Sequence, residues 1–208
     1  MALSKIDVAN MLTGEVPNAN VATIGVAKGG TGLTSGTSGQ ILKFTGSTTL
    51  ASAASSGTVK QIITGEHNTE VVSNSQSLTD TGLEATITLS STSSKVLVLV
   101  NQRLDMYGGS NIDDLRFSWR IRRDVSGGSN TYIRDSGTAN DQGVYTEGEA
   151  NDNIFRGFMT QSVIDSPSST AALTYKTFMI ESNSSAAITA NYTHGSANPR
   201  STIILMEF

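Results

Sequence analysis

The sequence predicts an all-β protein in which an extended N-terminal arm precedes a C-terminal β-sandwich of the jelly-roll type. Three observations support this fold class. The 208 residues include 20 glycines and many serines and threonines, a mixture that favours short strands joined by frequent turns. After Gly57 the apolar residues alternate with polar ones at a period of two, as in half-buried strands. The same part of the chain shows no long segment with the apolar period of a helix.

The composition argues against several classes of function. The formal net charge is −4 and no strongly basic patch is visible, so we predict no nucleic-acid partner. The absence of cysteine rules out disulfides and thiolate metal sites. The longest strongly apolar stretch, residues 96–100, is far shorter than the ~20 residues that span a bilayer, which predicts no membrane insertion. The first twelve residues lack the features of a secretory signal, which predicts synthesis in the cytoplasm of the host cell.

Residues 1–56 are the predicted arm. We expect a short helical turn over residues 4–11, with Ser4 as its N-cap, and extended chain elsewhere. The apolar residues are sparse and separated by glycines, so the arm alone cannot bury enough surface to offset the entropy of ordering it. We therefore expect it to be covered by identical arms or by another protein. The candidate attachment residues are Ile6, Val8, Met11, Leu12 and Val16.

Residues 57–208 are the predicted head domain. Turn signals, among them residues 80–82 and 107–110, separate the apolar segments. About ten short strands with regular turns indicate a two-sheet sandwich or jelly roll. The candidate strands are residues 58–64, 69–73, 85–89, 95–104, 115–123, 131–136, 154–163, 173–181, 187–192 and 202–208.

The segment 115–123 has the clearest alternation. One face carries Leu115, Phe117, Trp119 and Ile121, and the other carries Arg116, Ser118, Arg120 and Arg122. This pattern predicts a half-buried strand with Trp119 in the core and a solvated outer face. By contrast, residues 95–100 and 203–208 are apolar on both faces. Such strands need cover on two sides, from a central position in a sheet or from neighbouring chains around a three-fold axis.

Residues suited to catalysis are scarce. The two histidines, His67 and His194, lie in turn-like segments, and we interpret both as solvated loop residues. For the clustered carboxylates we favour loop solubility over a glycosidase pair or a calcium site. These carboxylates are Asp113, Asp114, Asp135, Asp141, Glu147, Glu149 and Asp152. We therefore predict no catalytic, cofactor-binding or metal-binding residue, and a protein that is not an enzyme.

Arginines in the segment 115–123 leave two explanations open. Arg116, Arg120, Arg122 and Arg123 could bind a sulfated or phosphorylated glycan, or could pair with acidic loops of the same or a neighbouring chain. We favour pairing with acidic loops.

Motifs in the arm resemble those of a known class of proteins. Residues 26–44 read VAKGGTGLTSGTSGQILKF, and residues 12–21 read LTGEVPNANV. The first segment resembles a repeat of bacteriophage tail fibres and related virion appendages, and the second resembles the stretch that precedes this repeat. The C-terminal STIILMEF is similar to the closing strand of many phage fibre heads. This resemblance implies a homotrimer with a slender shaft and a globular head, of the jelly-roll type found in tumour-necrosis-factor-like trimers.

The resemblance leads to a hypothesis about function. The chain is expected to be a virion structural protein, a short trimeric tail fibre that docks on other virion proteins through residues 1–50 and presents its head to the host surface. The alternatives are a capsid-decorating head fibre or a tail adaptor protein, and, less favoured, a polysaccharide-degrading tail enzyme. Besides identical chains and virion proteins, a host-surface glycan or protein is a candidate partner. The expected location is the phage particle, on the tail or the capsid surface.

Host contact is expected at exposed loops carried by the rigid head. The candidate loops are residues 105–114, 124–131, 136–153 and 164–170. Within them, the candidate contact residues are Tyr107, Asn111, Asn130, Tyr145 and Asn151.

Overall fold

The computed structural model describes residues 40–47, 50–53, 57–74, 76–108, 117–135, 153–181, 186–193 and 199–208. The chain divides into two compact units, Met1–Gly57 and Thr58–Phe208. In the first unit, β1 (Ile41–Phe44) pairs antiparallel with β2 (Leu50–Ala53). Both strands are short segments of the predicted arm, and their pairing as a hairpin was not foreseen. The helical turn expected at residues 4–11 lies outside the described residues.

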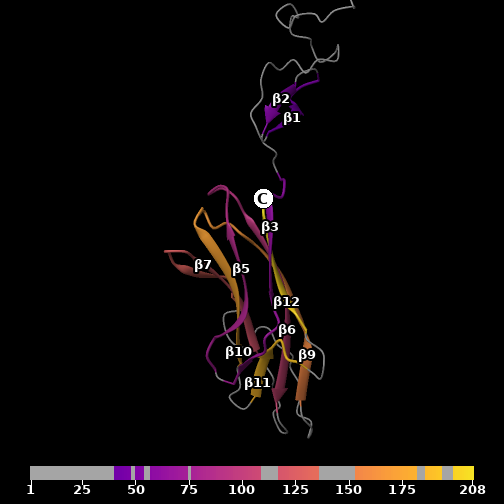
Figure 1. Cartoon of the computed structure of the whole chain (residues 1–208), viewed down its shortest axis with the longest axis vertical. Coiled ribbons are helices and arrows are strands. Elements are labelled where there is room, and N and C mark those ends of the chain that lie inside the picture. The colour runs from indigo at the N-terminus through magenta and orange to yellow at the C-terminus, as the bar shows by residue number, and fades with distance from the viewer. Residues whose placement is uncertain are drawn as a thin grey trace, which may run out of the picture. The chain divides into compact units, whose positions relative to one another are not determined.

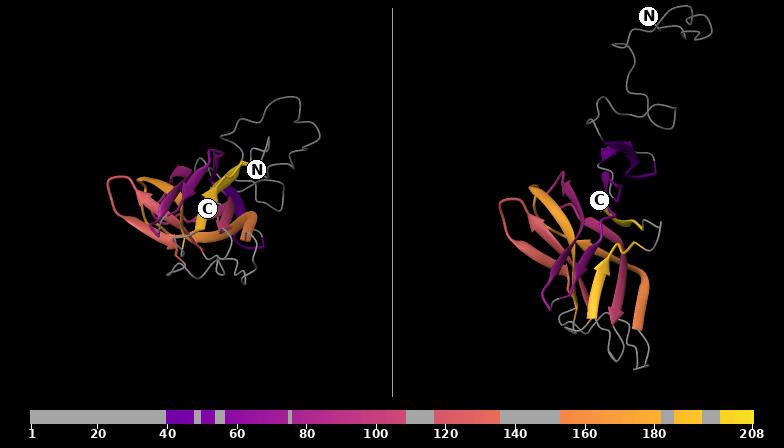
Figure 2. Two further views of the ribbon diagram at one scale, coloured as in Figure 1. Left: turned by 90° about the horizontal axis from the view of Figure 1, so that it is seen from below. Right: turned by 60° about the horizontal axis from the view of Figure 1, so that its bottom comes forward.

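The second unit contains two antiparallel sheets (Figure 1). The first sheet has six strands, and in it the thirteen-residue β6 pairs with three of the others. Figure 2 shows β12 in yellow beside β6, with β9 in orange at the outer side of β6. The strands of the first sheet are β3 (Gln61–His67), β4 (Val71–Ser73), β6 (Val96–Gly108), β9 (Asn153–Asp165), β11 (Ala186–Ala190) and β12 (Ser201–Glu207). The second sheet has the order β5 (Thr79–Thr88), β10 (Ala172–Glu181), β7 (Phe117–Val125) and β8 (Asn130–Arg134).

The registers reveal a jelly roll. Strands β11 and β12 pair with successive halves of β6, and β4 and β3 pair with β11 and β12 in turn. Strands β3 and β4 therefore act together as one interrupted strand, and β11 and β12 act together as another. Counted in this way, eight strands lie in the orders 1-8-3-6 and 2-7-4-5, the arrangement of a jelly roll. The predicted fold class, an all-β sandwich of the jelly-roll type, is confirmed.

The core lies between the two sheets. Trp119 and Tyr175 are its largest fully buried side chains, and Leu104 and Met106 of β6 pack in the same cluster. Each of the ten predicted head strands overlaps a strand of the structure, and residues 96–100 lie in a central strand, which is one of the two positions expected for the segment 95–100. The predicted burial of Trp119 is also confirmed.

The prediction that one face of the segment 115–123 is solvated is only partly correct. Ser118 is fully buried, and the side chains of Arg120 and Arg122 are 14% and 21% exposed. The reason is that β7 is an inner strand, between β10 and β8, and its arginines lie against the aromatic rings of Tyr132 and Phe178 on those neighbours. Leu115 and Arg116 lie outside the described residues.

The turn predicted at residues 80–82 is wrong, because these residues lie inside β5. The backbone N–H of Gly82 donates to Asp80 Oδ1 at 2.8 Å, and Gly82 has a φ of 78°. The register between β10 and β5 shifts at the same place. Asp and Gly therefore form a β-bulge rather than a chain reversal.

His67 is connected with this bulge. It ends β3 rather than lying in a solvated loop, and its Nε2 is buried without a hydrogen-bond partner. A Cβ at Gly82 would lie 2.5 Å from His67 Nε2, so the ring covers the glycine. The interpretation of His67 as a solvated loop residue is thus wrong, and His194 lies outside the described residues.

Polar side chains form a connected network in the middle of the core. The amide of Gln102, which is fully buried, accepts from Thr177 Oγ1 at 2.7 Å and from Thr81 Oγ1 at 3.2 Å, and donates to Ser201 Oγ at 3.0 Å. Ser201 in turn donates to Asn191 Oδ1, and Asn191 Nδ2 donates to the carbonyl of Thr69 at 3.0 Å. This network joins both sheets at the break between strands β11 and β12.

Candidate functional site: a pocket and an apolar face on one sheet

The predicted host-contact residues that the structure describes lie on strands. Tyr107 is the penultimate residue of β6, with 50% of its surface exposed, and Asn130 is the first residue of β8 and is exposed. The loop expected at residues 105–114 thus begins as strand up to Gly108. Three candidate contact residues, Asn111, Tyr145 and Asn151, lie outside the described residues. So do the arm residues Ile6, Val8, Met11, Leu12 and Val16.

The two described contact residues lie at opposite ends of the sandwich. Tyr107 pairs with Ile154 and Ala187, which are the second residues of β9 and β11. The turn before Asn130 lies at the other end, where the backbone N–H of Ser126 donates to the carbonyl of Ala172 at 2.9 Å. The structure therefore does not bring these two candidates into one site.

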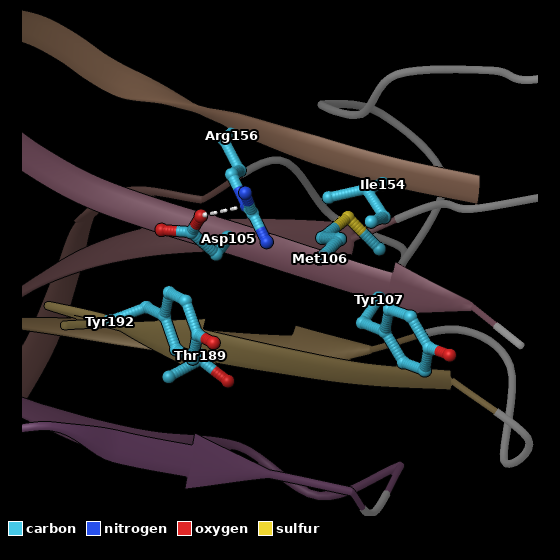
Figure 3. A pocket seen from close by; sticks show the side chains of 7 residues that line it. All are labelled: Asp105, Met106, Tyr107, Ile154, Arg156, Thr189 and Tyr192. Carbon is cyan, nitrogen blue, oxygen red and sulfur yellow. Dashed lines mark ion pairs between the residues drawn. The ribbon is translucent and has the colours of Figure 1, made fainter. Parts of the chain in front are cut away.

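A pocket of about 380 Å³ opens on the outer face of the first sheet, around Tyr107. Figure 3 shows β6 crossing the pocket between the side chains of β9 on one side and those of Thr189 and Tyr192 on the other. Its volume is in the range of small-molecule sites. The lining residues are Asp105, Met106, Tyr107, Ile154, Arg156, Thr189 and Tyr192.

Asp105 is the central charged group of this pocket. Its side chain is 8% exposed and accepts two hydrogen bonds from the Arg103 guanidinium, at 2.9 and 3.1 Å. Arg156 Nε lies 3.4 Å from Asp105 Oδ1. Burial raises the pKa of the Asp105 carboxyl, while the hydrogen bonds and charge of Arg103 and the charge of Arg156 act in the opposite direction. One buried carboxylate therefore holds two guanidinium groups.

Aromatic rings complete the pocket. The Arg156 guanidinium carbon lies 5.6 Å from the centre of the Tyr192 ring, and Arg103 has the same distance to the ring of Phe158. Such contacts fix the direction of each arginine while leaving other N–H groups available. Tyr107 and Ile154, which are 50% and 46% exposed, supply apolar surface at the end of the sheet.

The arginines singled out in the sequence pair with carboxylates of the same domain. Arg120 Nε lies 2.8 Å from Asp135, and Arg122 Nε lies 2.6 Å from Asp124. Arg123 Nη1 contacts both carboxylate oxygens of Asp165 at 2.7 Å, and the Tyr175 hydroxyl donates to the same carboxylate at 2.8 Å. All three arginines thus pair with carboxylates of the same domain, but the prediction named acidic loops, and Asp124 and Asp165 lie in the strands β7 and β9. Asp135 is the member of the predicted carboxylate set that the structure describes, and the rest lie outside the described residues.

A second feature of the outer face is a row of apolar side chains across four strands. Ile62 of β3 lies opposite Met206 of β12, Met206 opposite Leu97 of β6, and Leu97 opposite Ile164 of β9. Ile62 and Ile164 are 54% and 59% exposed, and the two central residues are half-buried. We call these four residues the outer apolar row. The half-buried Ile204 and Leu99 extend it toward the middle of the sheet.

The outer face of the second sheet is polar by comparison. Lys176 Nζ lies 2.5 Å from Glu84, and Thr86 and Thr174 share a hydrogen bond of 2.8 Å across β5 and β10. Each sheet therefore presents a different chemistry to its surroundings. The first sheet combines a pocket with an apolar row.

Sequence reasoning missed most of the pocket. Asp105, Arg156, Thr189 and Tyr192 come from segments up to 87 residues apart, and it is the registers of β6 with β9 and β11 that bring them together. The one available signal was alternation in β9, where Ile154, Arg156 and Phe158 share the outward face.

Two further features concern the described part of the chain. Within it, no group of three or more His, Cys, Asp or Glu side chains is arranged to hold a metal ion. Nor does any helix in these residues have the length and apolar character to cross a membrane.

Comparisons with known proteins give only a distant structural likeness. No protein-family model matches the chain, and no curated protein sequence matches it. Among solved structures, it is similar to the VP2 subviral particle of infectious bursal disease virus, with 12% identity and a TM-score of 0.36 over 79% of this chain and 41% of that one. The Gx strain of the same virus gives 14% identity and a TM-score of 0.36, over 81% of this chain and 41% of the other. The chain thus spans about two fifths of the length of these viral chains.

Proposed function

We propose that this chain is a virion structural protein, a short homotrimeric phage tail fibre that docks through its N-terminal arm and presents its jelly roll to the host surface. The arm motifs at residues 12–21 and 26–44 support a phage appendage. A capsid-decorating head fibre or a tail adaptor would carry the same motifs and the same head. The part of the proposal that rests on the structure is self-association of the head.

The observation that carries self-association is the outer apolar row. Ile62 and Ile164 are each more than half exposed although they lie in a sheet whose other face is already the core. A row of apolar side chains across four neighbouring strands, left in water, loses the free energy that its burial would provide. Identical chains around a closed symmetry axis can each cover the row of a neighbour.

The free edge of the first sheet supports the same arrangement. β9 is thirteen residues long and pairs with β6 on one side only, within the described residues. Its outward side chains include Phe158 and Ile164, which are 49% and 59% exposed. Long apolar edge strands promote uncontrolled association, and natural proteins cover them. Cover by a second copy would protect both the edge and the row.

The experiment is the mass of the full chain in solution by multi-angle light scattering. We expect three times the chain mass of 21.8 kDa for the natural sequence. Ile164→Glu places a charge in the row and should give smaller species, because an unpaired buried charge is costly. The control is Thr131→Glu, an exposed residue of β8 on the second sheet, which should leave the mass unchanged.

A monomeric natural chain would contradict the trimer. A full-chain trimer that Ile164→Glu leaves intact would show that the head does not associate through the outer apolar row. The arm's neighbour in the particle distinguishes tail fibre from head fibre: cross-linking of residues 1–30 to a tail protein supports the first, and to a capsid protein the second.

A further inference from the structure

The pocket on β6, β9 and β11 has the features of a specific ligand site. Its floor is the buried Asp105, its walls include two tyrosines and Ile154, and its volume of about 380 Å³ suits one or two sugar rings or a similar small group. It lies eight residues along β6 from Leu97 of the outer apolar row, or about 26 Å at ~3.3 Å per residue. Association through the row therefore does not require the pocket to be filled.

The charges of the pocket favour an anionic group. Arg103 already satisfies the Asp105 carboxylate with two short hydrogen bonds. Arg156 approaches the same carboxylate only at 3.4 Å, and its side chain is 41% exposed. Arg156 is thus the more exposed of the two guanidinium groups around Asp105, and its planar set of N–H donors matches a carboxylate. Glu70 influences Asp105 electrostatically but does not line the pocket.

The remaining walls favour a sugar ring. A pyranose has an apolar face and a rim of hydroxyl groups. The pocket offers the tyrosine rings and Ile154 to such a face, and the hydroxyls of Thr189, Tyr107 and Tyr192 to such a rim. Tyrosine side chains combine apolar area with a polar tip and lose little entropy on binding.

We propose that this pocket binds one acidic sugar unit of the hexuronate class. The sugar carboxylate pairs with Arg156, and the ring lies against Tyr107 and Tyr192. The inference deepens the proposed host-surface role and rests on it, since acidic polysaccharides are presented on cell surfaces as repeated units. A weak single site repeated on three chains would give the avidity that attachment needs.

The test uses the full chain and two simple probes. Methyl β-glucuronide and methyl β-glucoside differ in one carboxylate, and their binding is measured by chemical-shift changes in the protein over a millimolar titration. We expect saturable binding of the glucuronide, with shifts at pocket residues. The glucoside should bind at least about tenfold more weakly than the glucuronide, as loss of a charge-assisted hydrogen bond implies.

Variants assign the binding to the pocket. Arg156→Gln removes the exposed guanidinium while Arg103 still pairs with Asp105, so the fold should persist and glucuronide affinity should fall about tenfold. Tyr107→Ala removes an exposed ring and should weaken the binding of both probes. The matched control is Arg200→Gln, which breaks an exposed pair with Glu66 elsewhere on the sheet and should leave affinity unchanged.

Several results would overturn the inference. These are equal binding of the two glycosides, no saturable binding of either, an Arg156→Gln variant that binds as tightly as the natural chain, or tighter binding of acetyl-dialanine, a peptide with a free carboxylate. The oligomeric mass is measured on the same samples. A trimer that binds no glucuronide refutes only the pocket proposal, and a monomer that binds it refutes only the proposed assembly.

Discussion

At the scale of single residues, the sequence identified buried apolar side chains more successfully than buried charged ones. Trp119 stands in a strictly alternating segment, and its burial follows from that pattern alone. Glu207 shows the opposite case. It stands beside Met206 near an apolar chain end, and nothing local indicates that its side chain is 1% exposed.

The environment of Glu207 explains how a carboxylate is accommodated there. Its Oε1 accepts from the backbone N–H and the hydroxyl of Ser90, and its Oε2 accepts from Gln61 Nε2 at 2.6 Å. Burial acts to raise the pKa of Glu207, but the hydrogen bonds from Ser90, Gln61 and Ser94 outweigh it and lower the pKa to about 2. The folded state therefore stabilises the ionised carboxylate of Glu207.

This pKa leads to a prediction about acid stability. The folded pKa is below the ordinary value of 4.5, so Glu207 stabilises the fold above that pH, and this contribution is lost as pH falls toward about 2. We expect the loss to be on the order of 3 kcal/mol. Glu207→Gln should be less stable than the natural chain at pH 7 and should lose less stability between pH 6 and pH 2.5.

Denaturant unfolding at several pH values measures this difference. Glu66→Gln is the matched control, because Glu66 is an exposed carboxylate that pairs with Arg200 on the same sheet. Its pH dependence should run parallel to that of the natural chain. If the pH dependence of the Glu207→Gln variant also runs parallel to that of the natural chain, the hydrogen bonds at Glu207 do not stabilise its charged form.

At the scale of elements, the strands were predictable and their irregularities were not. Alternation, continuous apolar runs and turn signals located the head strands that the structure describes, because these are local properties of the sequence. The bulge at Gly82 and the interruptions between β3 and β4 and between β11 and β12 depend on what lies across the sheet. The buried amide of Gln102 is an example, since it satisfies groups on three other strands.

Removal of that amide gives a prediction for the junction of the two sheets. Gln102→Leu keeps the approximate volume but leaves hydroxyls of Thr81, Thr177 and Ser201 with fewer partners. We expect a destabilisation of about 2–4 kcal/mol from unsatisfied buried polar groups. Thermal or denaturant unfolding measures it.

Two comparisons make this result specific. Thr174→Val breaks an exposed threonine pair and should cost less than about 0.5 kcal/mol. The double variant with Thr177→Val should cost less than the sum of the single changes, because both remove members of one network. Strict additivity would mean that the network does not act as a unit.

At the scale of the whole molecule, the chain divides into two compact units. Among the residues that the structure describes, the buried members of the hydrophobic core lie between Leu83 and Leu205, within the second unit. The predicted arm belongs to the first unit. Its assigned roles in docking and trimerisation remain predictions from the motif resemblance.

Deletion of residues 1–30 tests the docking role. The head should retain a cooperative unfolding transition with an unchanged midpoint, since its core is intact. The shortened chain should no longer be incorporated into phage particles, as judged by its amount in purified particles relative to the full chain. Normal incorporation would show that attachment depends on another part of the chain.

The sequence by itself determined the all-β class, the sites of the head strands and the burial of Trp119, because period-two alternation and turn composition are local properties. The tertiary structure decided the rest. Strand order placed the Arg120 and Arg123 side chains against Asp135 and Asp165, and it gathered Asp105, Arg156 and Tyr192 into a pocket. These groupings depend on which strands pair and in which register, and such pairings join residues that no local pattern connects.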